Sequence, residues 1–215
     1  MNVRLALACA PLIAVLAMTA GDAVAQDEFE PLDPSTVDKP REDRWYIGAT
    51  GTVIRFHNIG SAGKRDNEYA SSFILGANLS EYFHTEGRFG QRWEDADNID
   101  GVAVDVEFFV SWYIGFHYPI SSAINVYGQF GFTDSNGRVQ VAPDPDVEGE
   151  PDPYGDYRYL EGDFPASGFS VSWIAGADYE LFDNTFVMVE YGSLFKDTAT
   201  EIDAYQISAG FRIEY

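Results

Sequence analysis

The sequence predicts an all-β fold, a single eight-stranded antiparallel up-and-down barrel. From Trp45 onward, apolar and polar residues alternate with a period of two, which is typical of strands. The connections between these segments alternate between short and longer, as in a closed series of hairpins. The chain has 215 residues, of which 46% are hydrophobic and 15% aromatic. That suits one packed domain and is too apolar for a disordered chain.

The first four predicted strands are residues 45–56, 69–79, 83–93 and 102–117. Each places large apolar residues on one face and smaller or polar residues on the other. The apolar faces are Trp45, Ile47, Ala49 and Val53; Phe73, Leu75 and Ala77; Phe83, Phe89 and Trp93; and Val104, Val106, Phe108, Val110, Trp112, Ile114 and Phe116. In the fourth strand, the opposite face is expected to carry Asp105, Glu107, Phe109 and Tyr113.

The last four predicted strands are residues 124–133, 169–181, 186–195 and 205–215. Their apolar faces are Ile124, Val126, Phe130 and Phe132; Phe169, Val171, Trp173 and Tyr179; Val187, Val189, Tyr191 and Phe195; and Tyr205, Ile207, Ala209, Phe211, Ile213 and Tyr215. The last strand alternates most cleanly, because Gln206, Ser208, Gly210, Arg212 and Glu214 occupy its other face.

Short turns are expected at residues 80–82, 118–123 and 182–185, and mostly longer loops at 58–68, 94–101, 134–168 and 196–204. The short turns therefore share one rim, and the even number of strands brings both chain ends to it. The loop at 134–168 carries nine acidic residues against Arg138 and Arg158. We expect it to face outward and to be mobile, since like charges oppose compaction.

The first 25 residues read as a signal peptide. Arg4 precedes an apolar run from Leu5 to Ala20, and Ala23-Val24-Ala25 is a typical cleavage site. A membrane-anchoring helix is the alternative, although the run is short for a span. Residues 26–43 are predicted to be a flexible acidic tail, and residues 44–215 the barrel domain. Because Cys9 is the only cysteine, the mature chain is expected to have no disulfide.

Alternation alone fits both a soluble lipocalin-like barrel and a membrane barrel. The polar face favours a narrow lumen, because it is rich in Gly, Ser and Asn and mixes Glu with Arg. The apolar face is too bulky to fill a small interior, and aromatic residues gather at the strand ends. The girdle predicted at the short-turn rim is Trp45, Tyr82, Phe83, Phe116, Tyr118, Tyr179, Phe182 and Tyr215. The girdle predicted at the other rim is Phe56, Tyr69, Trp93, Phe132, Phe169 and Phe195.

The signal peptide, the eight strands and the ending Ser208-x-Gly210-x-x-Ile213-x-Tyr215 resemble the small outer-membrane β-barrels of Gram-negative bacteria, similar to the OmpA transmembrane domain and to OmpX-like proteins. The opening Trp45-Tyr46-Ile47-Gly48-Ala49 also fits that family. The resemblance implies a last strand read by the barrel assembly machinery. The residues that it marks as this signal are Ser208, Gly210, Phe211, Ile213 and Tyr215. It also implies periplasmic chaperones, and lipid and lipopolysaccharide of the outer membrane, as partners.

The charged residues expected in the lumen form a candidate network. Its members are Glu86, Arg88, Arg92, Asp105, Glu107, Glu190 and Arg212, with Asp178, Glu180 and Glu214 also pointing inward. A catalytic or ion-conducting site is one interpretation. A plug of paired charges is the other, because buried charges need partners and eight strands leave little open space. Arg88 and Arg212 are expected to pair with Glu86, Glu107 or Glu190.

Other chemistry finds little support. The three histidines, His57, His84 and His117, show no matching serine and acid in sequence for a lipid A hydrolase or a protease. The stretch Asp144-x-Asp146-x-Glu148-Gly149 resembles the start of a calcium loop, but Gly155 stands where its closing acid is needed. We expect no metal site and no cofactor. With a net charge of −22, the chain is not expected to bind nucleic acid.

The sequence thus predicts a non-enzymatic protein of the bacterial outer membrane with a structural or surface-interaction role through its acidic loops. The ligand of those loops is unknown. Two alternatives remain: a narrow channel for ions or small solutes, and a lipid A-modifying enzyme.

Overall fold

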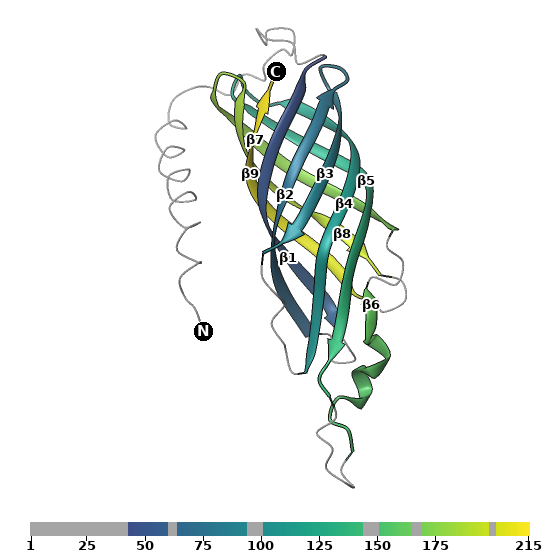
Figure 1. Ribbon diagram of the computed structural model, residues 1–215. Coiled ribbons are helices and arrows are strands. Elements are labelled where there is room, and N and C mark those ends of the chain that lie inside the picture. The colour runs from purple at the N-terminus through teal and green to yellow at the C-terminus, as the bar shows by residue number, and fades with distance from the viewer. Residues whose placement is uncertain (1–42, 60–63, 94–100, 144–150, 165–168, 198–200) are drawn as a thin grey trace. The chain divides into compact units, whose positions relative to one another are not determined.

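The computed structural model describes residues 43–59, 64–93, 101–143, 151–164, 169–197 and 201–215. The predicted signal peptide and all but one residue of the predicted tail lie outside these ranges. The described residues form a closed, antiparallel, eight-stranded barrel, which confirms the predicted fold class (Figure 1). None of the helices among them is long and apolar enough to cross a membrane.

Each barrel strand pairs with its neighbours in sequence order. The strands are β1 (Trp45–Ile59), β2 (Lys64–Asn78), β3 (Phe83–Arg92), β4 (Val102–Pro119), β5 (Ile124–Val141), β7 (Phe169–Phe182), β8 (Thr185–Lys196) and β9 (Asp203–Glu214). Pairing of β1 with β9 joins the first strand to the last, and the pairing of β4 with β5 completes the ring. A short additional strand, β6 (Gly162–Phe164), pairs with the far end of β5 and follows the 3₁₀ helix η2 (Gly155–Leu160).

Three tight turns lie at one rim of the barrel, together with the start of β1 and the end of β9. The Ser80 and Ser121 hydroxyls accept hydrogen bonds from the backbone N–H groups of Phe83 and Ile124, three residues later, at 3.1 and 3.0 Å. The backbone N–H of Tyr215 donates to the carbonyl of Trp45 at 2.8 Å, and Figure 1 shows the C-terminus at this rim. The predicted rim of short turns is therefore confirmed.

Between the short turns and the middle of the barrel, large apolar side chains cover the outer face, and the inner face carries polar and small side chains together with a few buried apolar ones such as Ile74, Ile174 and Met188. Strand β9 is representative: Ile207 and Phe211 are exposed, whereas Ser208 and Arg212 are buried. All eight aromatic residues predicted for the girdle at the short-turn rim are exposed. This half has the inside-out polarity that a lipid-facing barrel needs.

Nearer the long loops, the polarity of the wall reverses. In β1, Ile54 and Phe56 point inward while Arg55 is exposed. In β5, Ser135 and Val139 point inward while Arg138 is exposed. Such alternation, apolar inside and polar outside, belongs to a strand whose outer face meets water. It explains why β5 runs eight residues beyond its predicted end at Thr133, into the segment predicted as loop.

Bulges change the face of two strands and correct the sequence prediction. A bulge between Val106 and Phe108 turns Val104 and Val106 inward and leaves Glu107 exposed. A bulge between Ser193 and Phe195 turns Phe195 inward. Phe56 needs no bulge, because it shares the inward face of β1 with Thr52. Phe56 and Phe195 are thus core residues and not members of a girdle, while Tyr69, Trp93, Phe132 and Phe169 are exposed as predicted.

The longest loop is more ordered than predicted. Residues 134–141 belong to β5, and residues 155–164 form η2 and β6. Leu160 and Phe164 are buried in the apolar cluster inside the wall, which ties this part of the loop to the barrel. The prediction that the loop begins at Asp134 is therefore wrong, because β5 continues to Val141. Residues 144–150 and 165–168 lie outside the described part of the chain.

Three inward rings each lie over a glycine directly across the ladder. The pairs are Tyr46 over Gly76, Phe109 over Gly90 and Tyr127 over Gly176. A Cβ atom at any of these glycines would collide with the ring. The narrow lumen thus accommodates large side chains because the opposing residue has none.

Replacing Gly76 by alanine is expected to lower the free energy of unfolding by about 1–3 kcal/mol, because the Tyr46 ring must move within a filled interior. The measurement is urea unfolding of the barrel in detergent micelles. The control is Gly87→Ala on the neighbouring strand, where the new Cβ lies 3.9 Å from the nearest atom. That change should alter stability by less than about 1 kcal/mol. Equal effects of the two substitutions would contradict the account of a tightly packed lumen.

Candidate functional site

Arg88 is the centre of a buried polar network inside the barrel. From β3 its guanidinium donates to both carboxylate oxygens of Glu190 on β8, each at 2.6 Å. It also donates to Glu86 at 2.5 Å and to the side-chain oxygen of Gln129 at 3.3 Å. This paired, two-point contact spans the lumen and fixes both groups, since bidentate arginine–carboxylate pairs are the strong ones.

Two tyrosines also donate hydrogen bonds to these carboxylates. The Tyr46 hydroxyl donates to Glu86 at 3.0 Å, and the Tyr127 hydroxyl donates to Glu190 at 2.8 Å. The Arg88 guanidinium lies 5.6 Å from the centre of the Tyr113 ring. Both acids and the arginine are buried, and each carboxylate accepts hydrogen bonds from the guanidinium and from one tyrosine hydroxyl.

Arg212 forms a second buried cluster nearer the short-turn rim. Its guanidinium donates to Asp178 at 2.8 Å and lies 3.4 Å from a carboxylate oxygen of Glu214. Asn125 donates to the other oxygen of Asp178 at 2.7 Å. The guanidinium also lies 5.0 Å from the Phe186 ring centre. Arg212 therefore pairs with acids of β7 and β9, and not with Glu86, Glu107 or Glu190 as predicted.

Further polar side chains line the lumen beside the charged clusters. Thr133 lies 2.7 Å from the Ser111 hydroxyl and donates to the Ser172 hydroxyl at 3.0 Å. The Nδ1 atoms of His84 and His117 lie 3.2 Å apart, and His84 Nε2 lies 2.8 Å from the amide of Gln129. All of these residues are buried.

Only part of the predicted charge network is brought together in the lumen. Glu86, Arg88, Glu190 and Arg212 are buried there. Arg92 and Asp105 form an ion pair with each other and are partly exposed. Glu107 is exposed on the outer face. The bulge in β4 is the physical reason, because it moves Asp105 and Glu107 off the inward face.

Sequence reasoning missed Tyr46, Tyr127 and Gln129 as network members, and Glu68 as a buried acid outside the network. The first three could have been found, because each shares the inward face of its strand with residues that were predicted to line the lumen. Glu68 was placed in a loop. It lies in β2, where its carboxylate accepts from the backbone N–H of Val106 at 3.2 Å, beyond the end of β3. Nothing in the sequence marks that contact.

The loop-side half of the interior is filled by apolar side chains. The cluster is Ile54, Phe56, Ile59, Ala70, Val102, Val104, Val106, Phe109, Val139, Leu160, Phe164, Leu194, Phe195, Ile202 and Ala204. The Phe164 ring, contributed by β6, lies 6.3 Å from Phe56 and 5.5 Å from Phe195, centre to centre. This apolar plug and the polar network together occupy the described length of the barrel.

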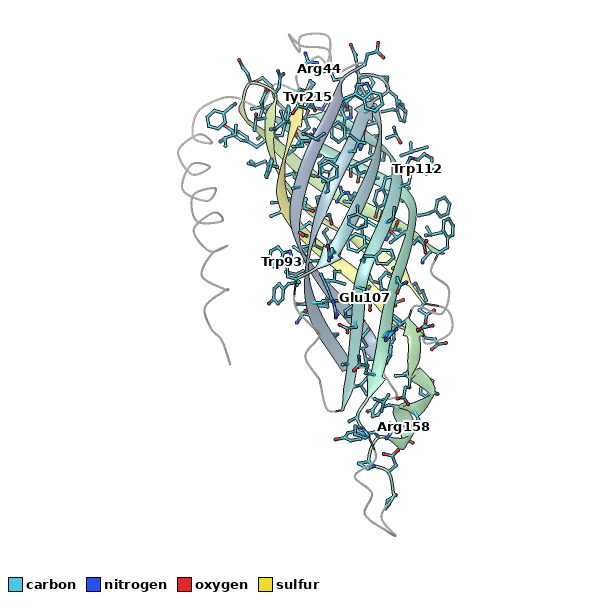
Figure 2. The ribbon with its side chains drawn as sticks, viewed as in Figure 1. Arg44, Trp93, Glu107, Trp112, Arg158 and Tyr215 are labelled. Atoms are coloured by element: carbon cyan, nitrogen blue, oxygen red, sulfur yellow. The ribbon has the colours of Figure 1, made fainter. Side chains whose placement is uncertain are left out.

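The described residues hold no group of three or more potential metal ligands. The calcium-loop-like residues Asp144, Asp146, Glu148 and Gly149 lie outside the described part of the chain. Asp152, which follows them, accepts hydrogen bonds from Arg158 at 2.9 Å and from the backbone of Tyr154 at 2.8 Å. The Arg158 hydrogen bond, with the one from Tyr154, holds the pKa of the Asp152 carboxyl below its ordinary value. Figure 2 places Arg158 at the loop end of the barrel, opposite Arg44 and Tyr215.

A double-mutant cycle is expected to show strong coupling between Arg88 and Glu190. Arg88→Met leaves two buried carboxylates without their guanidinium and should cost about 3–5 kcal/mol of unfolding free energy. Glu190→Gln should recover part of that cost in the double variant. The measurement is urea unfolding in detergent, with Arg138→Met on the exposed outer face as the control. If Arg88→Met and Arg138→Met destabilise the barrel equally, the lumen is hydrated enough to solvate its acids.

The comparisons with known proteins agree with this architecture. Residues 9–213 match the family described as outer membrane protein beta-barrel domain. A search of curated proteins gave no match. Among solved structures, the chain is similar to the attachment invasion locus protein Ail of Yersinia pestis, with a TM-score of 0.55 and 14% identity over 81% of this chain and 99% of that one.

Two further structures show the same fold. Neisserial surface protein A has a TM-score of 0.53 and 14% identity, covering 81% of this chain and all (100%) of that one. The N-terminal β-barrel domain of Pseudomonas aeruginosa OprF has a TM-score of 0.54 and 11% identity, covering 82% of this chain and 100% of that one. The family match over residues 9–213 agrees with the closed eight-stranded ring and its inside-out polarity. The chain therefore belongs to the outer membrane protein beta-barrel domain family and is a protein of the bacterial outer membrane.

Proposed function

We propose that the chain is a non-enzymatic outer-membrane protein that acts through its acidic loops on the cell surface. The observation that carries this proposal is the filled interior. A polar network of paired charges occupies the short-turn half, and an apolar cluster occupies the loop half. The barrel is then a rigid scaffold, and the loops are the part left to make specific contacts.

The filled interior counts against a channel. Ions and small solutes need a continuous hydrated path, and the apolar cluster lies across the loop end of the barrel. Residues from the longest loop, Leu160 and Phe164, are part of that cluster and are buried. A path through the other half would have to cross the Arg88–Glu190 contact.

The positions of two of the three histidines count against the lipid A-modifying alternative. A hydrolase acting on lipid needs its base within reach of the bilayer. His84 and His117 are buried in the lumen, where they contact each other. His57 lies at the loop end of β1, where its ring packs 5.3 Å from that of Tyr205.

The longest loop is the best candidate for a binding surface. Residues 142–168 carry eight acidic residues against Arg158. The described part of this loop is anchored by η2 and β6, which present the exposed Tyr159 ring outside the barrel. A fixed aromatic ring in an acidic surface suits a cationic partner. The similar solved structure, Ail of Yersinia pestis, is named as an attachment invasion locus protein, and that name is consistent with the proposed surface role.

Binding of a fluorescent deca-arginine peptide to the mature chain in lipid nanodiscs tests the proposal. We expect binding that weakens as NaCl rises, because the contacts are electrostatic. Replacing residues 143–153 by a Gly-Ser linker of equal length should remove most of the binding. The control lacks the acidic tail, residues 26–43, and should still bind. Binding that depends on the tail and not on the loop would overturn the assignment.

We also propose that Ser208, Gly210, Phe211, Ile213 and Tyr215 form an assembly signal. The apolar members point out of the barrel, so a partner can reach them: Phe211 and Tyr215 are exposed and Ile213 is partly so. Ser208 bonds Thr52 across the β1–β9 seam at 2.9 Å, and a Cβ on Gly210 would collide with the Ala49 carbonyl. These two support closure of the barrel after insertion.

Tyr215→Ala is expected to lower the amount of folded protein in the outer membrane and to leave refolding of purified protein in detergent unchanged. The substitution keeps the backbone hydrogen bond to Trp45. The control is Tyr118→Ala, another exposed aromatic of the same rim. The measurement is the heat-modifiable mobility of membrane fractions on gels. Normal levels of the Tyr215 variant, or equal loss in the control, would mean that Tyr215 is only one girdle residue among several.

A further inference from the structure

Two histidines lie side by side in the lumen, near the short turns. His84 on β3 and His117 on β4 are buried, and their rings stack with centres 5.4 Å apart. Their Nδ1 atoms are 3.2 Å apart. Gly115, opposite His84 on β4, makes room for the ring, because a Cβ atom there would collide with it. A neutral imidazole has one N–H donor and one acceptor nitrogen, so one ring can donate to the other.

The orientation of Gln129 fixes which ring is the donor. Its side-chain oxygen accepts from Arg88 at 3.3 Å, because a guanidinium can only donate. Its NH2 group therefore faces Nε2 of His84, 2.8 Å away, and donates to it. Since this Nε2 is an acceptor, a neutral His84 carries its proton on Nδ1 and donates to Nδ1 of His117. The hydrogen bonds thus run in one direction, from Arg88 through Gln129 and His84 to His117.

An extra proton on the histidine pair does not fit this arrangement. The two Nδ1 atoms already share one proton, and His117 carries another on its Nε2, so the extra proton must go to Nε2 of His84. That nitrogen then faces the NH2 group of Gln129, donor against donor. Turning over the Gln129 amide aims its oxygen at His84 but aims its NH2 group at the guanidinium of Arg88. The amide therefore has two orientations, one for each charge state of the pair.

Charged and titratable side chains from the other strands surround the pair. The His84 ring packs edge-on against Tyr46 on β1 and Tyr127 on β5, with centres 6.5 and 6.2 Å away. The same polar region holds Glu86 and Arg88 on β3, Tyr113 on β4, Asp178 on β7, Glu190 on β8, Arg212 and Glu214 on β9, and the uncharged Asn78 on β2; at the rim, Arg44 and Glu180 bond to Asn184. Each of the four buried acids lies within 3.4 Å of an arginine nitrogen. Gln129 therefore connects these ion pairs to the histidines.

We propose that His84, His117 and Gln129 form a pH-sensitive switch that acts on Arg88. Above about pH 7 the pair is neutral and Gln129 bonds to Arg88; in acid the pair holds one extra proton, and Gln129 turns its oxygen to His84. Arg88 then loses its bond to Gln129. Because Arg88 also makes the contact with Glu190 that crosses the lumen, the switch changes how firmly that contact is held. The switch depends on the fold and not on the proposed role of the loops.

NMR of the mature chain in detergent micelles tests the switch. At about pH 8, ¹⁵N–¹H spectra of the imidazole rings should show Nδ1–H for His84 and Nε2–H for His117, with the His57 signals identified by the His57→Gln variant. On lowering the pH to about 5, one titration step should appear in both rings. The NH2 signals of Gln129 and the guanidinium signals of Arg88 should move at the same midpoint. The same tautomer in both rings, no titration, or constant Gln129 and Arg88 signals while the rings titrate would each overturn the proposal.

Three variants separate the switch from a general effect of charge, once heat-modifiable gel mobility has shown that they are folded. In Gln129→Glu, the carboxylate can accept from Arg88 and from a protonated His84 together, so the midpoint should rise by about 1–3 pH units. The matched control is Gln91→Glu, which adds the same charge on the exposed face of β3 and should move the midpoint by less than about half a unit. Equal shifts in these two variants would contradict the role of Gln129.

His84→Gln carries the test even where Gln129→Glu does not fold. Without His84, the signals of Gln129 and Arg88 should no longer respond between about pH 8 and pH 5. A response that persists in this variant would show that another group causes it, and would overturn the switch.

Discussion

The closed ladder of eight strands imposes the constraint on which the rest of this structure depends. A ring of this size encloses a space about as wide as the side chains that line it. Each inward residue must therefore fit against those facing it across the lumen, and each inward charge must find a partner there, because little water can serve instead. The structure satisfies this constraint in two ways. Buried charges are paired, as in the Arg88–Glu190 contact, and large rings lie over residues without side chains, at Gly76, Gly90 and Gly176.

The outside of the same wall meets two different surroundings, and the polarity of the wall changes accordingly. Between the short-turn rim and the loop-side girdle, the strands are apolar on their outer face, and their inner face carries the charged network together with a smaller apolar cluster around Ile74 and Ile174. Beyond it they are polar outside and apolar inside, as in a soluble protein, and Ile54, Val139 and Leu194 form a core there. The interior thus has a buried charged network toward the short turns and an apolar cluster toward the loops. The two complement each other, because the apolar cluster excludes water from the charged network and so strengthens its ion pairs.

The strand positions and the shared rim of the termini were predictable because alternation and turn spacing are local properties of the sequence. The two faces were predictable within the lipid-facing half for the same reason. The reversal beyond it was not predicted: Ser135, Gly137, Val139 and Val141 alternate with polar residues, but the segment was predicted as part of a loop because residues 134–168 are long and rich in Asp, Glu, Gly and Pro. The alternation was present in the sequence, but here the polar residues occupy the outer face and the inner face is the more apolar one.

Other errors had no sequence signal. The bulge between Val106 and Phe108 shifts the phase of β4 by one residue, which moved Asp105 and Glu107 off the lumen face. The choice of partners within the lumen depends on the closure of β4 onto β5 and of β1 onto β9, which brings Glu190 to Arg88 and Asp178 to Arg212 across long sequence separations. Pairings set by ring closure cannot be read from any single strand.

We propose that the interior is closed along its length, so that the barrel is a scaffold and not a pathway. Planar-bilayer recording tests it most directly. Purified mature protein, inserted with the orientation checked by protease, should give no stepwise conductance in 1 M KCl across the voltages that the bilayer tolerates. Uniform steps that scale with salt concentration, and that grow when Phe56 and Phe164 are both replaced by alanine, would show a hydrated path and contradict the account.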